Sequence, residues 1–230
     1  MNVGTPWRTE DRRLVRDVAA ISLAVGFVGL SFGAIAVASG LPRWSVVAMS
    51  LIVFAGGSQF MAIAMLAGGN PVAAILGGLM LNARHLPFGL AVADAVGESR
   101  WRRLIGAHLM VDESVAFALA QPDARRRRFA YWLTGTVLFL CWQIGTVAGV
   151  AVGSAVGDPA TYGLDAAFPA CLLALLMPTL RRPDARRVAI VGAAVAVAAS
   201  FVLPAGLPVL LALTGLAAAG RSKTLTEVTA

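Results

Sequence analysis

Long apolar blocks separated by short polar segments dominate this chain of 230 residues. Most blocks have the roughly 20 residues that a helix needs to cross a hydrocarbon core about 30 Å thick. The pattern therefore predicts an all-α polytopic membrane protein. The blocks are Val18–Ser39, Trp44–Ala67, Pro71–Ala93, Leu104–Ala120, Phe129–Gly157, Tyr162–Leu180 and Val188–Ala219.

The last block is too long for a single crossing. Its centre reads Leu203-Pro204-Ala205-Gly206-Leu207-Pro208, and prolines in this arrangement end a helix. We therefore expect two short helices there and seven to eight transmembrane helices in all, some of them broken or re-entrant.

Composition agrees with this class. Hydrophobic residues make up 58% of the chain and charged residues only 13%, about half the share of roughly 25% in soluble domains. We expect one transmembrane domain at 18–220, between a basic cytoplasmic segment at 1–17 and a polar tail at 221–230. The first block is too long for a signal peptide and lacks a clear cleavage motif, so it is expected to be retained.

The net charge of +7 comes from arginine clusters that lie next to apolar blocks, around residues 8–16, 100–103, 125–128 and 181–187. Such clusters mark cytoplasmic loops of inner-membrane proteins, so the lipid bilayer is the expected partner and nucleic acid is not. Eight crossings with both termini inside would leave Arg100–Arg103 outside, against this rule. The conflict disappears if Leu104–Ala120 does not cross and one of the two preceding blocks is re-entrant.

Glycine-rich motifs recur in the two halves of the chain, at Gly29–Gly33 and Gly145–Gly149. Many transporters consist of repeats, so an internal repeat is one interpretation, and close helix packing is the other. Cys141 and Cys171 lie inside apolar blocks without metal-ligand spacing. We interpret both as small core residues and expect neither a metal nor another cofactor.

The second block contains Gly56-Gly57-Ser58-Gln59 in an apolar context. Glycine weakens a helix, and a glutamine amide in hydrocarbon needs partners. One hypothesis is a break in the helix that exposes backbone groups to a cavity. The alternative is a continuous helix that packs closely at its glycines, with Gln59 bonded to a neighbour.

Asn82, Arg84 and His85 follow one another closely in the third block. A charged residue this deep in a membrane segment usually faces a cavity or a partner, and these side chains offer donors for a carboxylate. If the block instead ends near Asn82, Arg84 is an interfacial anchor. In the fourth block, Asp112 and Glu113 are candidates for an ion pair with Arg84 and for proton coupling, or for a charged interfacial turn without a role.

These residues carry a resemblance to the AzlC-type branched-chain amino acid permease family. The segment Ala55-Gly56-Gly57-Ser58-Gln59-Phe60 and the pair Asn82-x-Arg84-His85 are specific at this spacing, and Asp112-Glu113 continues the likeness. The resemblance implies an exporter of aliphatic amino acids in the cytoplasmic membrane, working with a small hydrophobic subunit of the AzlD type. It also marks Ser58, Gln59, Asn82, Arg84 and His85 as site residues.

Two other functional classes remain as alternatives. An intramembrane hydrolase would use Ser58 as nucleophile and His85 as base, although no nucleophile loop is evident. A structural subunit of another membrane protein would need no site at all. The chain has no phosphate-binding loop, so transport driven by an ion or substrate gradient is expected rather than transport driven by ATP. An enzyme is not expected.

Overall fold

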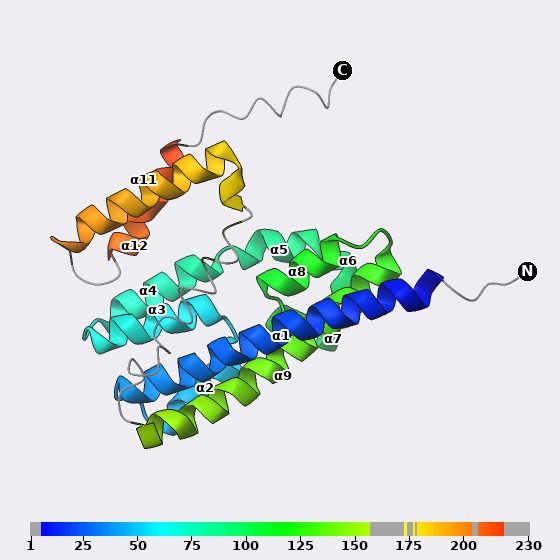
Figure 1. The fold of residues 1–230 in the computed structure, drawn as a ribbon, viewed down its shortest axis with the longest axis horizontal. Helices are drawn as coiled ribbons and strands as arrows, with labels where there is room; N and C mark the ends of the chain where they lie inside the picture. The colour runs from blue at the N-terminus through cyan, green and yellow to red at the C-terminus, as the bar shows by residue number, and fades with distance from the viewer. Residues whose placement is uncertain (1–5, 157–172, 174–176, 178, 204–206, 219–230) are drawn as a thin grey trace, which may run out of the picture. The chain divides into compact units, whose positions relative to one another are not determined.

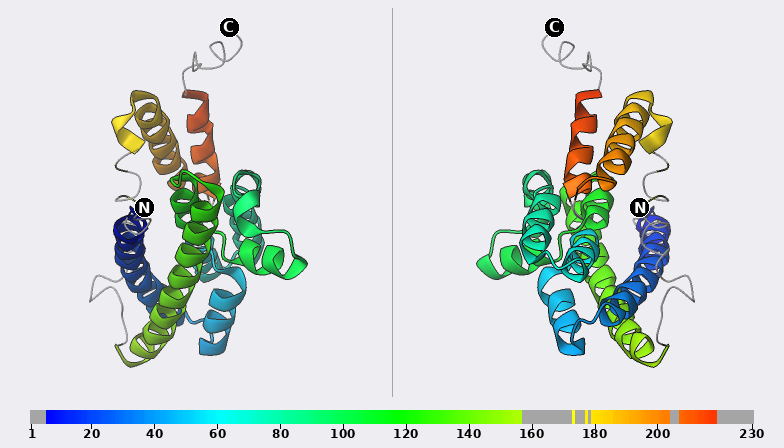
Figure 2. Two further views of the ribbon diagram at one scale, coloured as in Figure 1. Left: turned by 90° about the vertical axis from the view of Figure 1, so that its right-hand side faces the viewer. Right: turned by 90° about the vertical axis from the view of Figure 1, so that its left-hand side faces the viewer.

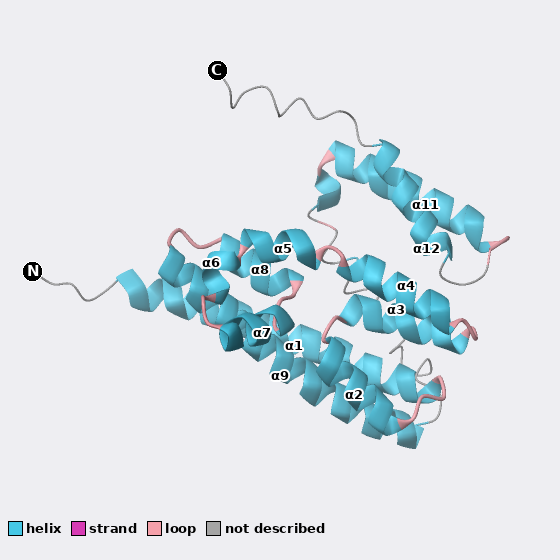
Figure 3. Ribbon diagram, turned by 180° about the vertical axis from the view of Figure 1, so that it is seen from behind, coloured by secondary structure: helices cyan, strands magenta, loops and turns pink. Residues whose placement is uncertain are grey.

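A computed structural model describes residues 6–156, 173, 177, 179–203 and 207–218. Regular structure within these residues is helical (Figure 3). The chain divides into two compact units, one comprising residues 1–60 and 78–168 and the other residues 61–77 and 169–230. Most of the block Tyr162–Leu180, Cys171 and the predicted tail at 221–230 lie outside the described residues.

Two long helices, α1 (Pro6–Ala38) and α9 (Ala124–Val156), form the frame of the first unit. In the described part of the chain, two helical segments are long and apolar enough to cross a membrane, Asp11–Ala38 and Ala124–Ala155. The predicted count of seven to eight crossings therefore stays a prediction. The basic segment expected at 1–17 is helical from Pro6 and continuous with α1.

Glycines bring α1 and α9 together along their lengths (Figures 1 and 2). A side chain at Gly145 would overlap the carbonyl oxygen of Gly26, and one at Gly149 would overlap that of Leu30. The helices are parallel, because Gly26 lies beside Cys141 whereas Gly153 lies beside Ala34. The two glycine motifs thus pack against each other, as small residues do between membrane helices. Whether they also mark a repeat stays a prediction.

The second and third blocks are each interrupted. The second block forms α2 (Arg43–Val53) and α3 (Gly56–Ala67), and the third forms α4 (Pro71–Asn82), α5 (His85–Ala91) and the start of α6 (Ala93–Val96). Broken helices were expected from the sequence, and both interruptions lie next to predicted site residues.

The fourth block does not form one continuous crossing helix. It contains most of α7 (Arg100–His108) and then α8 (Asp112–Leu119), with an extended residue, Val111, between them. Helices of nine and eight residues span only about 14 and 12 Å at 1.5 Å per residue, too little for a hydrocarbon core. The block is therefore broken, and whether its two helices together cross the membrane stays a prediction.

Local chemistry explains the interruption after His108. The Ser114 hydroxyl accepts a hydrogen bond from the backbone N–H of Val111 at 3.0 Å, which closes the start of α8. Asp112 and Glu113 occupy the first turn of α8, where negative charge is stabilised by the helix dipole. Both features favour a new helix start.

The short helices α6, α7 and α8 of the first unit pack against the arginine-rich end of α9. Val92, Ala95, Val115, Ala118 and Tyr131 form a buried cluster there. The Tyr131 hydroxyl donates a hydrogen bond to the carbonyl oxygen of Gly106 at 2.7 Å and so fixes α7 against α9.

The second unit contains most of α3, the turn after it, the first half of α4 and the C-terminal helices. These are α11 (Pro183–Ser200), α12 (Leu207–Leu211) and the 3-10 helices η2 (Thr179–Arg181) and η3 (Ala212–Ala218). Gly192 and Gly215 allow α11 and η3 to pack with backbone in contact. The last block is split between Ser200 and Leu207, which confirms the two-helix prediction.

Candidate functional site

The break in the second block is centred on Phe54, which ends α2. Phe54 has left-handed backbone angles (φ 39°, ψ 54°), and its N–H bonds to the carbonyl oxygen of Ser50 at 3.3 Å. This conformation costs a non-glycine residue about 1–2 kcal/mol. Packing offsets that cost, because the Phe54 ring is buried and lies 5.0 Å from the ring of Phe139 and 6.2 Å from that of His108.

Gln59 and Ser58 fold back to the break from the first turns of α3. The Gln59 Oε1 accepts the N–H of Ala55 at 3.0 Å, and the Ser58 hydroxyl donates to the carbonyl oxygen of Ala55 at 2.9 Å. Both side chains are buried. A helix break is therefore present next to these residues, with Gln59 bonded inside it, whereas the cavity that the hypothesis attached to the break stays a prediction.

The glycine pair plays a different part from the one predicted. Gly56 and Gly57 are helical and begin α3, so the break precedes them rather than including them. A Cβ at Gly56 would lie 3.0 Å from Cη2 of Trp142, so the missing side chain admits the Trp142 ring. Trp142 stacks on Phe32 at 5.6 Å, and Phe60 contacts Phe32 edge-on at 5.6 Å.

A buried polar group that the sequence analysis missed joins α2 to α9. The Ser50 hydroxyl donates to Gln143 Oε1 at 2.9 Å and lies 3.2 Å from the hydroxyl of Thr146. The Gln143 Nε2 donates to the carbonyl oxygen of Ser50 at 3.1 Å. Gln143 is a glutamine in an apolar block, so the reasoning that singled out Gln59 would have found it too.

The third block is interrupted at Arg84, between the end of α4 and the start of α5. His85 lies in the first turn of α5, and its Nδ1 is 2.9 Å from the carbonyl oxygen of Asn82. The Asn82 side chain is half-buried, and its Oδ1 has no hydrogen-bond partner. Asn82 lies one turn beyond Gly78, where a Cβ would be 3.9 Å from the Cβ of Ser58.

Arg84 forms an ion pair with Asp112, the first residue of α8. The Arg84 Nη1 and the Asp112 Oδ2 are 2.9 Å apart, and the side chains are 40% and 43% exposed. The structure therefore gives Arg84 a carboxylate side chain as its partner, which was one of the alternatives that the sequence left open. Glu113, which follows Asp112, is half-buried.

The predicted residues thus form two groups within the first unit. The break group comprises Gly56, Gly57, Ser58 and Gln59, and the ion-pair group comprises Asn82, Arg84, His85, Asp112 and Glu113. The Ser58 hydroxyl donates to a backbone carbonyl, and a ring nitrogen of His85 is also bonded to one. These bonds give no support to a pair of Ser58 and His85 acting as nucleophile and base.

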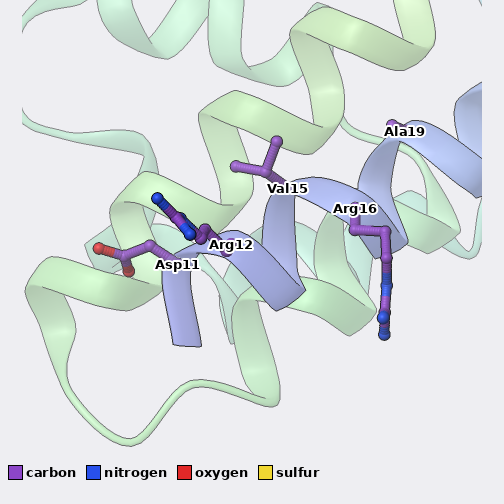
Figure 4. Close-up of a pocket in the computed structure, with 5 residues that line it drawn as sticks. All are labelled: Asp11, Arg12, Val15, Arg16 and Ala19. Carbon is purple, nitrogen blue, oxygen red and sulfur yellow. The ribbon is translucent and has the colours of Figure 1, made fainter. Parts of the chain in front are cut away.

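A surface hollow of about 480 Å³ lies elsewhere, on the first turns of α1 (Figure 4). Asp11, Arg12, Val15, Arg16 and Ala19 line it. Its lining is mainly exposed and includes none of the predicted site residues, so we do not assign it to the function.

Comparison with known proteins gives a consistent result. The family model described as AzlC protein matches residues 20–156. The chain is 28% identical to the branched-chain amino acid transport protein AzlC of Bacillus subtilis, over 82% of this chain and 78% of that protein. It is 29% identical to the inner membrane protein YgaZ of Escherichia coli, over 77% of each chain.

A third relative has a higher identity over a shorter stretch and a less specific name. The chain is 33% identical to an uncharacterized membrane protein of Archaeoglobus fulgidus, over 74% of this chain and 76% of that protein. No solved structure matches the chain.

Proposed function

This chain belongs to the AzlC family of membrane proteins, and we propose that it is a secondary transporter that exports branched-chain and related aliphatic amino acids. The named Bacillus subtilis relative supports the substrate class. The observation that carries the proposal is the helix break at Phe54 and Ala55, inside a segment that is otherwise apolar.

A helix break suits an amino acid substrate for electrostatic reasons. The C-terminal end of α2 carries partial negative charge and the N-terminal end of α3 partial positive charge, and the two ends meet at Ala55. An amino acid has an ammonium and a carboxylate on the same carbon, so it can meet both ends at once. Unwound backbone of this kind is tolerated at membrane depth only where protein or a cavity surrounds it.

The energy source in this proposal is an ion gradient, with protons as the first candidate. Glu113 and the pair of Arg84 and Asp112 supply ionisable groups next to a second interruption, at the start of α5. The chain is placed in the cytoplasmic membrane with both termini inside, as its arginine clusters favour.

A small hydrophobic subunit of the AzlD type is the proposed partner. Its absence should lower the abundance of this chain or its transport rate. The measurement is leucine export from cells that produce this chain alone or together with a candidate subunit encoded beside it. Full export by the purified chain alone in liposomes would contradict the partnership and leave the transport function standing.

Transport itself is tested by the movement of labelled L-leucine across proteoliposomes that contain the chain with its candidate subunit. Gly56→Leu should abolish transport, because the new side chain would run into the Trp142 ring at the start of α3. Gly89→Leu is the matched control, because the nearest atom to a Cβ there is the flexible end of Met110 at 3.7 Å. Absence of leucine movement with the unaltered chain would refute the proposed function.

A further inference from the structure

The side-chain amide of Gln59 is buried but only partly satisfied. Gln59 is 1% exposed, and its Oε1 accepts the N–H of Ala55. A backbone N–H can only donate, so the atom that faces it must be the amide oxygen. The Nε2 is then left without a partner, and it lies at the N-terminal end of α3 because its own oxygen is bonded there.

The start of α3 provides further donors at the same place. The first N–H groups of a helix have no partner within the helix, and here they belong to Gly56, Gly57 and Ser58. The Trp142 ring meets Gly56 with its carbon edge, Cη2 and Cζ3, and so borders these donors with apolar surface. Donors gathered at a helix N-terminus favour a negatively charged ligand.

We propose that the start of α3 binds the carboxylate of the transported amino acid, with the Gln59 Nε2 and the N–H groups of Gly56 and Gly57 as donors. This inference rests on the proposed function and specifies its recognition site. It gives the unsatisfied amide of Gln59 a role, since a buried donor without a partner is destabilising unless a ligand bonds to it.

The surroundings of this site fit an aliphatic side chain. The Trp142 ring lies beside Gly56, Phe32 stacks on Trp142 and Phe60 packs on Phe32, so the neighbourhood of the donors is apolar. Arg84 is not needed as a ligand in this arrangement, because it already has an anionic partner in Asp112. The Arg84 guanidinium would attract a substrate carboxylate less strongly while it is paired with Asp112.

The first experiment changes the ligand and keeps the unaltered full-length chain. Binding of labelled L-leucine is measured in membrane vesicles that contain the chain, in competition with two analogues. These are 4-methylpentanoate, which lacks the ammonium, and 3-methylbutylamine, which lacks the carboxylate. We expect 4-methylpentanoate to compete measurably and the amine to compete at least tenfold more weakly. Equal or stronger competition by the amine would overturn the carboxylate site.

The second experiment changes Gln59 alone. Gln59→Glu keeps the acceptor for the Ala55 N–H and places a charged oxygen where the Nε2 was, so the break should persist while the carboxylate is repelled. Glutamate near a helix N-terminus is also favourable for folding. Leucine binding should weaken by at least tenfold at unchanged membrane abundance.

Gln121→Glu is the matched control. In the unaltered chain the Gln121 Nε2 donates to the carbonyl oxygen of Phe117 at 3.2 Å, after the end of α8 and away from the start of α3. The same change from amide to carboxylate at this position should leave leucine binding unchanged. Undiminished leucine binding by Gln59→Glu would refute this site while leaving leucine transport by the unaltered chain as evidence for the function. Failure of the unaltered chain to bind or transport leucine would remove both ideas.

Discussion

Single polar side chains in the apolar segments differ in how completely they are bonded. Ser50 and Gln143 exchange hydrogen bonds and leave little unsatisfied, which is typical of a structural contact. Gln59, Asn82 and Trp142 each keep one polar atom without a partner. Ser22 and Thr134 also have a buried oxygen without a partner, so what distinguishes Gln59 is that its unbonded donor lies at the start of a helix.

The ion pair of Arg84 and Asp112 leads to a prediction about protein abundance. Arg84→Gln should lower the membrane abundance, because Asp112 would keep its charge without compensation. Arg84→Gln combined with Asp112→Asn should restore abundance toward that of the unaltered chain. Quantitative immunoblotting of membrane fractions measures both. Equal losses in the single and the double variant would show that the pair does not account for the effect.

The bond between Ser50 and Gln143 leads to a prediction about stability. Gln143→Leu should lower the free energy of unfolding by about 1–3 kcal/mol, because it removes the amide oxygen that accepts from the Ser50 hydroxyl and one of the two donors to the Ser50 carbonyl oxygen, the other being the Phe54 N–H. Adding Ser50→Ala should recover part of the loss, since removing both partners is less costly than removing one. Thermal unfolding in detergent gives the double-mutant cycle, and strictly additive losses would argue against the coupling.

At the scale of elements, the contact between α1 and α9 depends on glycines. Gly149→Ala should destabilise the chain and reduce its abundance, because the new methyl group would overlap the carbonyl oxygen of Leu30 on α1. The backbone of α1 would have to move, and close approach is what stabilises such helix pairs.

Gly89→Ala in α5 is the matched control for that substitution. The nearest atom to a Cβ there is in the flexible Met110 side chain at 3.7 Å, and alanine favours a helix over glycine by about 1 kcal/mol. Thermal unfolding and abundance should therefore be unchanged or slightly improved. A similar loss in the two variants would mean that the α1–α9 contact tolerates extra volume.

At the scale of the whole molecule, the fold of the first unit bears on the conflict over the arginine clusters. Because α1 and α9 are parallel, the clusters at 12–16 and 125–128 lie at the same end of the pair. Arg100–Arg103 belongs to α7, which is tied to that end through Tyr131, and Arg127 bonds to Asp94 nearby at 3.1 Å. All three clusters can therefore lie on the cytoplasmic side.

Cysteine labelling tests this topology. In a background without Cys141 and Cys171, the single variants Arg13→Cys, Arg103→Cys and Arg125→Cys should all react with a membrane-impermeant maleimide in inside-out vesicles. The same variants should stay unlabelled in intact spheroplasts, because the proposed topology places each position on the cytoplasmic side. Labelling of Arg103→Cys from the periplasmic side alone would show that residues between α7 and α9 cross the membrane after all.

The sequence by itself determined the class of the molecule. Apolar blocks of membrane length and a low charge content do not depend on which helix touches which, so the helical membrane class followed from composition and block length. The split of the last block followed from Pro204 and Pro208, since proline breaks a helix for local steric reasons. The family followed from short motifs around Ser58 and Arg84.

Only the tertiary structure decided where the second block breaks and which charges pair. Phe54 takes a left-handed conformation that its own sequence does not favour, and rings from α7 and α9, at His108 and Phe139, hold it there. Arg84 had several candidate anions, and the packing of α5 on α8 selected Asp112. Such outcomes depend on contacts between residues far apart in the chain, which local pattern and composition do not contain.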